Sequence, residues 1–405
     1  MRIESFSAYH LRVPLKMTIK HASHARSAND AVVIACRLSE GTVGWGEGLP
    51  RPYVTGETIE SVFSMLESGN AVEPLLGQPA DDLAAVVALC RTLEPGSHAD
   101  GLRSGFGNSL RCALELSVLD AVTRSKKKSL SAIFDAIPEI QSLRGAAEFA
   151  QYSAVFPDLP MWKLISYSYW ARVARMRHVK IKVGVAGKND LARLRAVRKA
   201  IGPRMDLRID ANEAWTPEEL PRQLERFRDV NISSVEQPVP HEQLAGLAGQ
   251  RGKSAIPIML DESVCTREDL ELAVREGYCD LVNLRISKCG GLISTCLIAA
   301  AAHEQGIGYQ LGCQVGETGI LSAAGRHLAT SLSHFKYCEG SYDSYILQRQ
   351  LTAPDITCDW SGRAPALTSL GLGVDVDRDA LRQMTVSEKH WQIEPMKLRA
   401  GGRQP

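Results

Sequence analysis

The chain lacks the features that mark several large protein classes. No apolar run reaches the ~20 residues of a membrane-spanning helix, and the amino terminus lacks the basic start and apolar centre of a signal peptide. Lys+Arg 47 against Asp+Glu 46 leaves a formal net charge of +1, so no excess of positive charge attracts nucleic acid or an anionic membrane. We therefore expect neither a nucleic-acid partner nor a membrane partner.

The cysteines and histidines lack the spacing of metal sites. The ten cysteines contain no CxxC pair, and most of them lie in apolar segments. Free thiols of this kind are typical of a reducing compartment, so we expect a cytoplasmic protein. None of the ten histidines has metal-ligand spacing at a strand end, which argues against a zinc hydrolase.

A repeated strand-and-helix pattern fills the middle of the chain. Strand-like runs recur about every 23 to 28 residues, and a helix-patterned stretch follows each of them. Eight such units predict a (β/α)8 barrel, which typically takes ~250 residues with its surroundings. The runs centre near Tyr152, Lys180, Arg208, Val235, Leu260, Asn283, Gln310 and Tyr337.

The flanking segments predict a cap on that barrel. The fold class is α/β, a (β/α)8 TIM-like barrel with an α+β capping domain formed by the N-terminal segment and the C-terminal tail. We expect the N-terminal capping domain at 1–145, the barrel at 146–350, and a segment that returns to the cap at 351–405. The glycine-rich stretch after residue 40 predicts a loop. The expected cap elements are strands near 2–13 and 30–38 and helices near 58–66 and 108–125.

Three carboxylates stand at the ends of consecutive predicted strands. Asp210, Glu236 and Asp261 are about 25 residues apart. Because parallel barrel strands end on one face, we expect these side chains to converge there. Hard oxygen ligands without histidine or cysteine predict Mg²⁺, with Mn²⁺ as a substitute. Asn212 lies on the same side as Asp210 and is predicted to be its hydrogen-bonding neighbour.

Two lysines precede the carboxylates by one repeat unit. Side chains alternate along a strand, so Lys180 and Lys182 point to the same side. An isolated KxK is more often a solvated strand, but a barrel strand is covered on both faces and tolerates charge only at its ends. Repulsion between two close ammonium groups disfavours their protonated forms and predicts that one lysine is a base. A base facing a divalent cation favours removal of a proton α to a carboxylate.

The motifs KIK, DAN, EQP and DES, in this order, resemble the enolase superfamily. They are similar to the muconate cycloisomerase (muconate lactonizing enzyme) and mandelate racemase-like subgroup, and the GWGEG and GLGV segments extend the resemblance over nearly the whole chain. The resemblance implies that Lys182 is the general base and that Lys180 neutralises the substrate carboxylate and tunes its neighbour. It further implies that the acidic trio binds the metal and that Glu317, in QVGET, faces the bound substrate.

One position departs from the pattern of the family. Resembling proteins usually carry a lysine 24 residues beyond the last metal ligand, across the substrate from the KxK base, and here that residue is Arg285. Arginine keeps its proton, so it binds a carboxylate or stabilises an enolate but does not act as a base. An ion pair at the barrel rim is the simpler interpretation of Arg285, and Lys288 is the alternative base.

The expected reaction depends on the absence of a second catalytic lysine at position 285. We expect an isomerase or lyase that works with one base, through cycloisomerisation or syn-dehydration. An amino-acid or dipeptide racemase or epimerase is the alternative enzyme, because such enzymes in the resembling subgroup use two lysines on opposite faces of the α-carbon. A barrel that binds a carboxylate without catalysis is the alternative from a different class.

Candidate substrate contacts come from the cap loops and from the ends of the barrel strands. They are Arg26, Tyr53, Asn212 and Glu339. In resembling dipeptide epimerases an acidic pair on the eighth strand binds an ammonium, and Glu339 retains half of that pair, which leads to the hypothesis of a cationic nitrogen beside it. The expected partner is a small carboxylate, and the resemblance favours a homo-oligomer.

Overall fold

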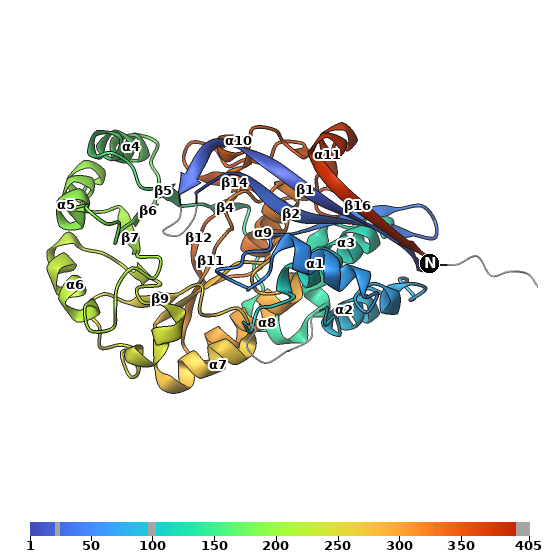
Figure 1. The fold of residues 1–405 in the computed structure, drawn as a ribbon, viewed down its shortest axis with the longest axis horizontal. Coiled ribbons are helices and arrows are strands. Elements are labelled where there is room, and N and C mark those ends of the chain that lie inside the picture. Colours follow the sequence, from blue (N-terminus) through green and yellow to red (C-terminus); the bar gives the residue numbers. More distant parts are fainter. Residues whose placement is uncertain (21–24, 96–102, 394–405) are drawn as a thin grey trace, which may run out of the picture.

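The computed structural model describes residues 1–20, 25–95 and 103–393 and contains two main sheets (Figure 1). A four-stranded antiparallel sheet is built from both ends of the chain, and an eight-stranded parallel sheet is built from its middle. In these ranges, no helix combines the length and the apolar character needed to cross a bilayer.

The parallel sheet is the predicted barrel. A parallel bridge between Tyr152 and Cys338 joins its first and last strands and closes it. All eight predicted runs lie on or beside a strand, so the expected fold is confirmed. The strands are β5 (Ala154–Phe156), β6 (His178–Lys182), β7 (Asp206–Asp210), β8 (Val235–Glu236), β9 (Ile258–Leu260), β10 (Leu281–Leu284), β11 (Gly308–Leu311) and β12 (Phe335–Cys338).

Helices follow most barrel strands and cover the outside of the sheet (Figure 1). They are α4 (Met161–Val173), α5 (Asp190–Ile201), α6 (Leu220–Phe227), α7 (Arg267–Glu276), α8 (Leu292–Glu304), α9 (Gly319–Ser331) and the short α10 (Asp343–Ile346). The 3-10 helices are η1 (Glu73–Leu75), η2 (Leu130–Ala136), η3 (Pro138–Leu143), η4 (Arg228–Val230) and η5 (His241–Leu247).

The cap sheet joins the two ends of the chain. Its strand order is β16-β1-β2-β3, and β16 pairs with β1, so the C-terminal segment does return to the N-terminal one. The strands are β1 (Ile3–Lys20), β2 (Ala25–Leu38), β3 (Val43–Gly48) and β16 (Thr385–Gln392), and the helices are α1 (Ile59–Glu67), α2 (Leu83–Arg91), α3 (Asn108–Ser125) and α11 (Arg378–Met384). Two further pairs are β4 (Phe149–Gln151) with β14 (Arg363–Pro365) and β13 (Thr352–Ala353) with β15 (Asp375–Val376).

The glycine-rich stretch after residue 40 is a strand in part, so the prediction of a loop was wrong for β3. A Cβ added to Gly44, Gly46 or Gly48 would lie within 2.0 Å of a backbone atom of α3. These glycines occupy alternate positions of one strand face, where α3 packs directly on the backbone. Close packing, and not turn formation, is the reason for glycine here.

Two cap carboxylates bind the first turns of two barrel helices. Glu47, on β3, accepts hydrogen bonds from Thr318 N–H (3.0 Å), Thr318 Oγ1 (2.8 Å) and Leu321 N–H (3.2 Å) at the start of α9. Glu115, on α3, accepts from the N–H groups of the first two residues of α8, at 2.5 and 3.1 Å. Negative charge is favoured there because the first N–H groups of a helix lack intrahelical partners. The cap is thereby fixed to the face where the barrel strands end.

Glu47→Gln is expected to remove part of the pH dependence of stability. Burial raises the pKa of Glu47 to about 7. A pKa raised in the folded state stabilises folding at low pH, and this contribution is lost as the pH rises from about 4.5 through 7. At 1.36 kcal/mol per pKa unit the loss is up to about 3 kcal/mol. Urea unfolding at pH 5 and pH 8 should show a smaller loss in the variant, whereas parallel losses would contradict this assignment.

Candidate active site

Strand register brings the predicted metal ligands and lysines to one end of the barrel. Lys182 on β6 lies opposite Asp210 on β7, and Asp210 lies opposite Glu236 on β8. Asp261 directly follows β9, the next strand of the sheet. The three acidic residues are at most 3% exposed. Residues about 25 apart in sequence therefore become neighbours at the carboxyl ends of adjacent strands.

Lys180 is held as a cation by three buried carboxylates. Its Nζ donates to Glu236 Oε2 at 2.9 Å and to Glu339 Oε2 at 2.7 Å, and Asp210 Oδ2 lies 3.7 Å away. Burial lowers the pKa of Lys180, but the three carboxylates outweigh burial and raise it well above the usual lysine value. Lys180 therefore keeps its proton. Its ammonium contacts protein carboxylates, whereas the resemblance assigned it to the substrate carboxylate.

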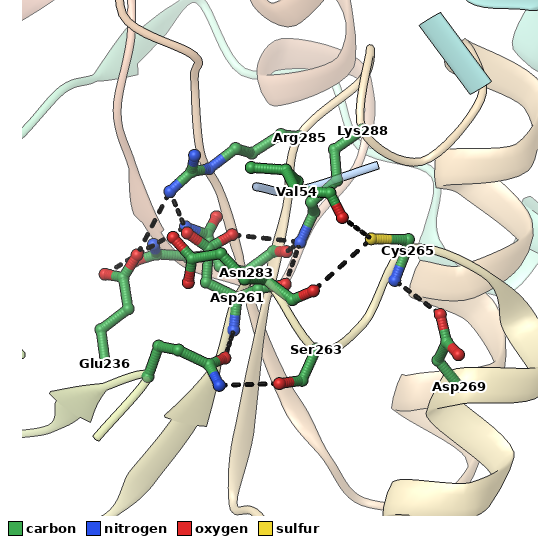
Figure 2. Close-up of polar contacts among 12 residues, drawn as sticks. Val54, Glu236, Asp261, Ser263, Cys265, Asp269, Asn283, Arg285 and Lys288 are labelled. Carbon is green, nitrogen blue, oxygen red and sulfur yellow. Dashed lines mark hydrogen bonds and ion pairs between the residues drawn. The ribbon is translucent and has the colours of Figure 1, made fainter. Parts of the chain in front are cut away.

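Arg285 and Lys288 converge on Asp261 (Figure 2). Arg285 bonds Asp261 Oδ2 and lies 3.7 Å from Glu236 Oε1, which also accepts from Asn283 Nδ2 at 2.8 Å. Lys288 Nζ donates to the main-chain oxygens of Asp261 (2.6 Å) and Asn283 (2.7 Å). Because Lys288 is 0% exposed and fully hydrogen-bonded, its position favours a structural role over that of a replacement base. Arg285 is ion-paired with Asp261, as the simpler of its two interpretations predicts.

Lys182 differs from these cations because its side-chain nitrogen has no bonding partner among the described residues. It is half-buried, and no residue in the described ranges offers its Nζ a hydrogen bond or an ion pair within 4.0 Å. Asp210, its register partner on β7, interacts with it electrostatically through space. The two lysines of KIK are thus different groups: one is a fixed cation, and the other is available for proton transfer.

The acidic trio suits a divalent cation such as Mg²⁺. Every donor is a hard carboxylate oxygen, on Asp210, Glu236 or Asp261. Burial and the charge of Glu236 raise the pKa of Asp210 to about 6. A cation bound at the trio would neutralise the negative charge that Glu236 adds to this effect of burial.

A second polar cluster lies just beyond the strand ends. Within the described ranges, Glu213, His241 and Glu242 form the one group of three whose ligand atoms all lie within 4.8 Å of one another. His241 Nδ1 lies 2.9 Å from Glu213 Oε1, and its Nε2 lies 2.8 Å from the exposed Glu242. Their mutual contacts explain this cluster without an ion. The predicted trio is not such a group, and Lys180 and Arg285 lie against its oxygens.

Further polar residues inside the barrel contact the residues around Lys180. The sequence analysis did not predict them. Arg208 Nη1 lies 3.0 Å from Glu339 Oε1, and its Nη2 donates to Ser153 Oγ at 2.7 Å. Gln310 also accepts from Arg208. The signal that identifies Arg208 is alternation: it stands two residues before Asp210 and therefore points to the same side of β7.

Glu339 and Glu317 lie beyond β12 and β11. Glu339 is 5% exposed, and its two oxygens face Lys180 and Arg208, so its carboxylate is not free for the hypothesised substrate ammonium. Glu317 accepts from Gln314 N–H at 2.6 Å, and burial raises its pKa to about 8. Both carboxylates line one small cavity, which has room for about one water molecule.

The other predicted substrate contacts come from three different elements. Asn212 follows β7 with φ +43°, and its main-chain N–H, not its side chain, donates to Asp210 Oδ1 at 3.0 Å. Tyr53 is half-buried after β3, and its main-chain oxygen accepts from Arg103. Arg26 is on β2, but its side chain lies outside the described residues.

The barrel matches a known family of proteins. The family described as enolase C-terminal domain-like matches residues 168–380, a range that holds both lysines, the acidic trio, Arg285 and Glu339. This match agrees with the resemblance predicted from the four motifs.

Two characterised proteins are similar in sequence, and one solved structure is similar in fold. A hydrophobic dipeptide epimerase of Enterococcus faecalis is 28% identical over 338 residues, which cover 82% of this chain and 88% of that protein. An N-succinyl-L-Arg/Lys racemase of Bacillus cereus is 25% identical over 400 residues, which cover 95% and 98%. A dipeptide epimerase of Cytophaga hutchinsonii, complexed with Mg and D-Ala-L-Val, has a TM-score of 0.81 at 22% identity and covers 96% of this chain and 100% of that chain. The last likeness shows a shared fold.

Proposed function

Since the chain belongs to the enolase superfamily, we propose that it removes the α-proton of a small carboxylate with Lys182 as the base. We propose a dipeptide or an N-acylated amino acid as the substrate, because similar proteins are named for epimerisation or racemisation of these compounds. The sequence analysis gave epimerisation as the alternative reaction, and the comparisons favour it over cycloisomerisation. The lyase outcome has no support from these relatives.

The observation that carries the proposal is the unpaired side-chain nitrogen of Lys182 beside the acidic trio. Lys182 lies in register with Asp210, and no described residue pairs with its Nζ. The neutral amine takes the α-proton, and the electrons of the broken C–H bond move into the substrate carboxylate. Lys180 and Arg285 remain charged throughout, so they balance the carboxylates without exchanging protons.

Asp210, Glu236 and Asp261 are the residues that would hold Mg²⁺ or Mn²⁺. A divalent cation bound there supplies positive charge where negative charge develops on the substrate. The barrel shields the acidic residues from water, and this low exposure strengthens every electrostatic contact at the site. Arg285 adds a second positive charge beside Asp261.

Asp261→Asn is expected to weaken Mg²⁺ binding by more than about 100-fold, since loss of an outer-shell partner alone costs about 10–100-fold. Calorimetric titration of the chelator-treated protein with Mg²⁺ measures this effect without a substrate. Glu268→Gln, an exposed acid on α7, is the matched control and should bind like the wild type. Equal affinity in Asp261→Asn and the control would remove Asp261 from the ligand set.

Arg285 favours a second candidate function, which is a one-base reaction on the same face of the substrate. No lysine of β10 or its following loop is free in the described ranges, because Lys288 is buried under Asp261. One base suffices for cycloisomerisation or syn-dehydration, whereas inversion of a stereocentre by two bases needs an acid on the opposite face. The two candidates therefore differ in what happens to the second enantiomer.

Solvent exchange separates these candidates. Both enantiomers of N-succinyl-arginine and a set of hydrophobic dipeptides are incubated with Mg²⁺ in deuterated water and followed by NMR. An epimerase converts either isomer into a deuterated mixture, whereas a one-base enzyme labels one isomer only. No exchange with any compound, with Mg²⁺ binding intact, would instead support a barrel that binds carboxylates without catalysis.

We also propose that the protein works in a reducing compartment such as the cytoplasm. All ten cysteines are free thiols, and all but Cys313 are buried. Burial raises the pKa of Cys36, Cys265, Cys279 and the other thiols, so they stay protonated and unreactive. Such thiols are typical of proteins that fold without disulfide formation.

A further inference from the structure

The outer face of α4 is apolar and aromatic, although it points away from the barrel. Trp162 is 67% exposed, Tyr169 49%, Trp170 39% and Val173 82%. Their spacing places them on one helix face around the exposed Ser166, opposite the buried residues of the helix. Figure 1 shows α4 at the outer edge of the barrel, on the side away from β16.

A distant segment extends this surface. Trp360, 68% exposed, stands in an edge-to-face contact with Trp170, with ring centroids 6.0 Å apart. Trp360 lies in the segment between β13 and β14, and the only helix between β12 and this segment in the described residues is the four-residue α10. We call Trp162, Tyr169, Trp170, Val173 and Trp360 the α4 aromatic face.

The α4 aromatic face is large for a monomer. With exposed areas scaled to roughly 150–250 Å² for a whole aromatic side chain, the five residues expose on the order of 650 Å². The largest apolar patch of a typical monomer is about 300–600 Å², whereas a stable interface buries about 800 Å² per partner. The face and a rim of neighbouring residues therefore reach the area that a stable dimer needs.

We propose that the α4 aromatic face is a dimer interface and that its occupant is the same face of a second copy of the chain. Ser166 lies midway between Trp162 and Trp170, four residues from each. When two α4 helices pack antiparallel about a twofold axis at Ser166, each Trp162 meets the partner copy's Trp170. The small serine lets the helices approach, and a net charge of +1 gives the copies little mutual repulsion.

Sedimentation of the wild type and two variants tests this interface. At about 10 μM, where a micromolar dissociation constant leaves most chains paired, the wild type should sediment at two chain masses or a higher even multiple. Ser166→Glu should sediment at half that mass or less, because it places two carboxylates face to face without disturbing a buried residue. The double variant Trp162→Ser/Trp170→Ser should show the same reduced mass as Ser166→Glu. Leu272→Ser, at an exposed apolar position of α7, is the control and should keep the wild-type mass.

A cross-linking experiment tests the twofold axis directly. Ser166→Cys treated with a short bis-maleimide should give a covalent dimer, whereas Ser64→Cys on the exposed face of α1 and the wild type should not. A monomeric wild type, an unchanged mass for Ser166→Glu, or equal cross-linking of the two cysteine variants would overturn the proposal. A monomer that floats with phosphatidylcholine vesicles would assign the face to a lipid surface instead.

Discussion

Lys182→Ala is expected to slow exchange of the substrate α-proton by at least about 10³-fold, because a positioned general base contributes roughly 10²–10⁴-fold. The variant should fold normally, since no described residue pairs with Lys182 Nζ. Its free energy of unfolding should therefore change by less than about 0.5 kcal/mol, as for other surface-like substitutions. Exchange is measured by NMR in deuterated water with Mg²⁺, and stability by urea unfolding.

Lys180→Ala is the informative contrast to this variant. Its removal leaves Glu236 and Glu339 buried with one cation fewer, so the expected cost is about 3–5 kcal/mol of stability. Lys199→Ala, on the exposed side of α5, controls for loss of a lysine and should change neither quantity. If Lys182→Ala retained exchange while Lys180→Ala lost it without destabilisation, the roles of the two lysines would have to be reversed.

Arg285→Lys is expected to add a second base across the substrate from Lys182. The enantiomer that the wild type exchanges slowly should then exchange at least about 10²-fold faster, the lower end of a general base's contribution. A lysine at 285 must be neutral to act as a base, but Lys288 still donates to Asp261 Oδ1 at 3.1 Å, so the metal site should remain intact. The measurement is deuterium incorporation into each enantiomer separately, together with optical rotation of the recovered substrate.

Arg285→Gln is the matched control, because it shortens the side chain without adding a base. Faster exchange in both variants would indicate that relief of crowding, and not proton transfer by residue 285, causes the change. If the wild type already inverts both enantiomers at equal rates, some other residue returns the proton and the one-base candidate is excluded.

The sequence predicts the barrel and its acidic trio because both follow from the regular spacing of the strand-and-helix units. The repeated strands define the fold. A barrel strand is covered on both faces, so a charged residue at its carboxyl end lies at the mouth of the barrel. The positions of Asp210 and Glu236 follow from this rule alone. The strand β3 was missed for the opposite reason. Its glycines suggest a turn until α3, which comes later in the chain, is known to pack against them.

The partners of Lys180, Glu339 and Lys288 are not predictable from local pattern. Lys180 and Glu339 come from β6 and from the end of β12, so their 2.7 Å contact depends on closure of the barrel. Lys288 folds back on Asp261 through a loop whose path no repeat specifies. Sequence identifies which residue types are present at the rim, whereas their pairing depends on rotamers and on strands far apart in the chain.

The pairing of β1 with β16 has a consequence for biosynthesis. At roughly 5–20 residues per second, a ribosome makes β16 about 20 to 70 s after β1. The outer edge of β1 therefore stays unpaired until β16 has been made. During this interval the unpaired edge of β1 can pair with a strand of another chain, so the risk of aggregation is greatest before β16 is made.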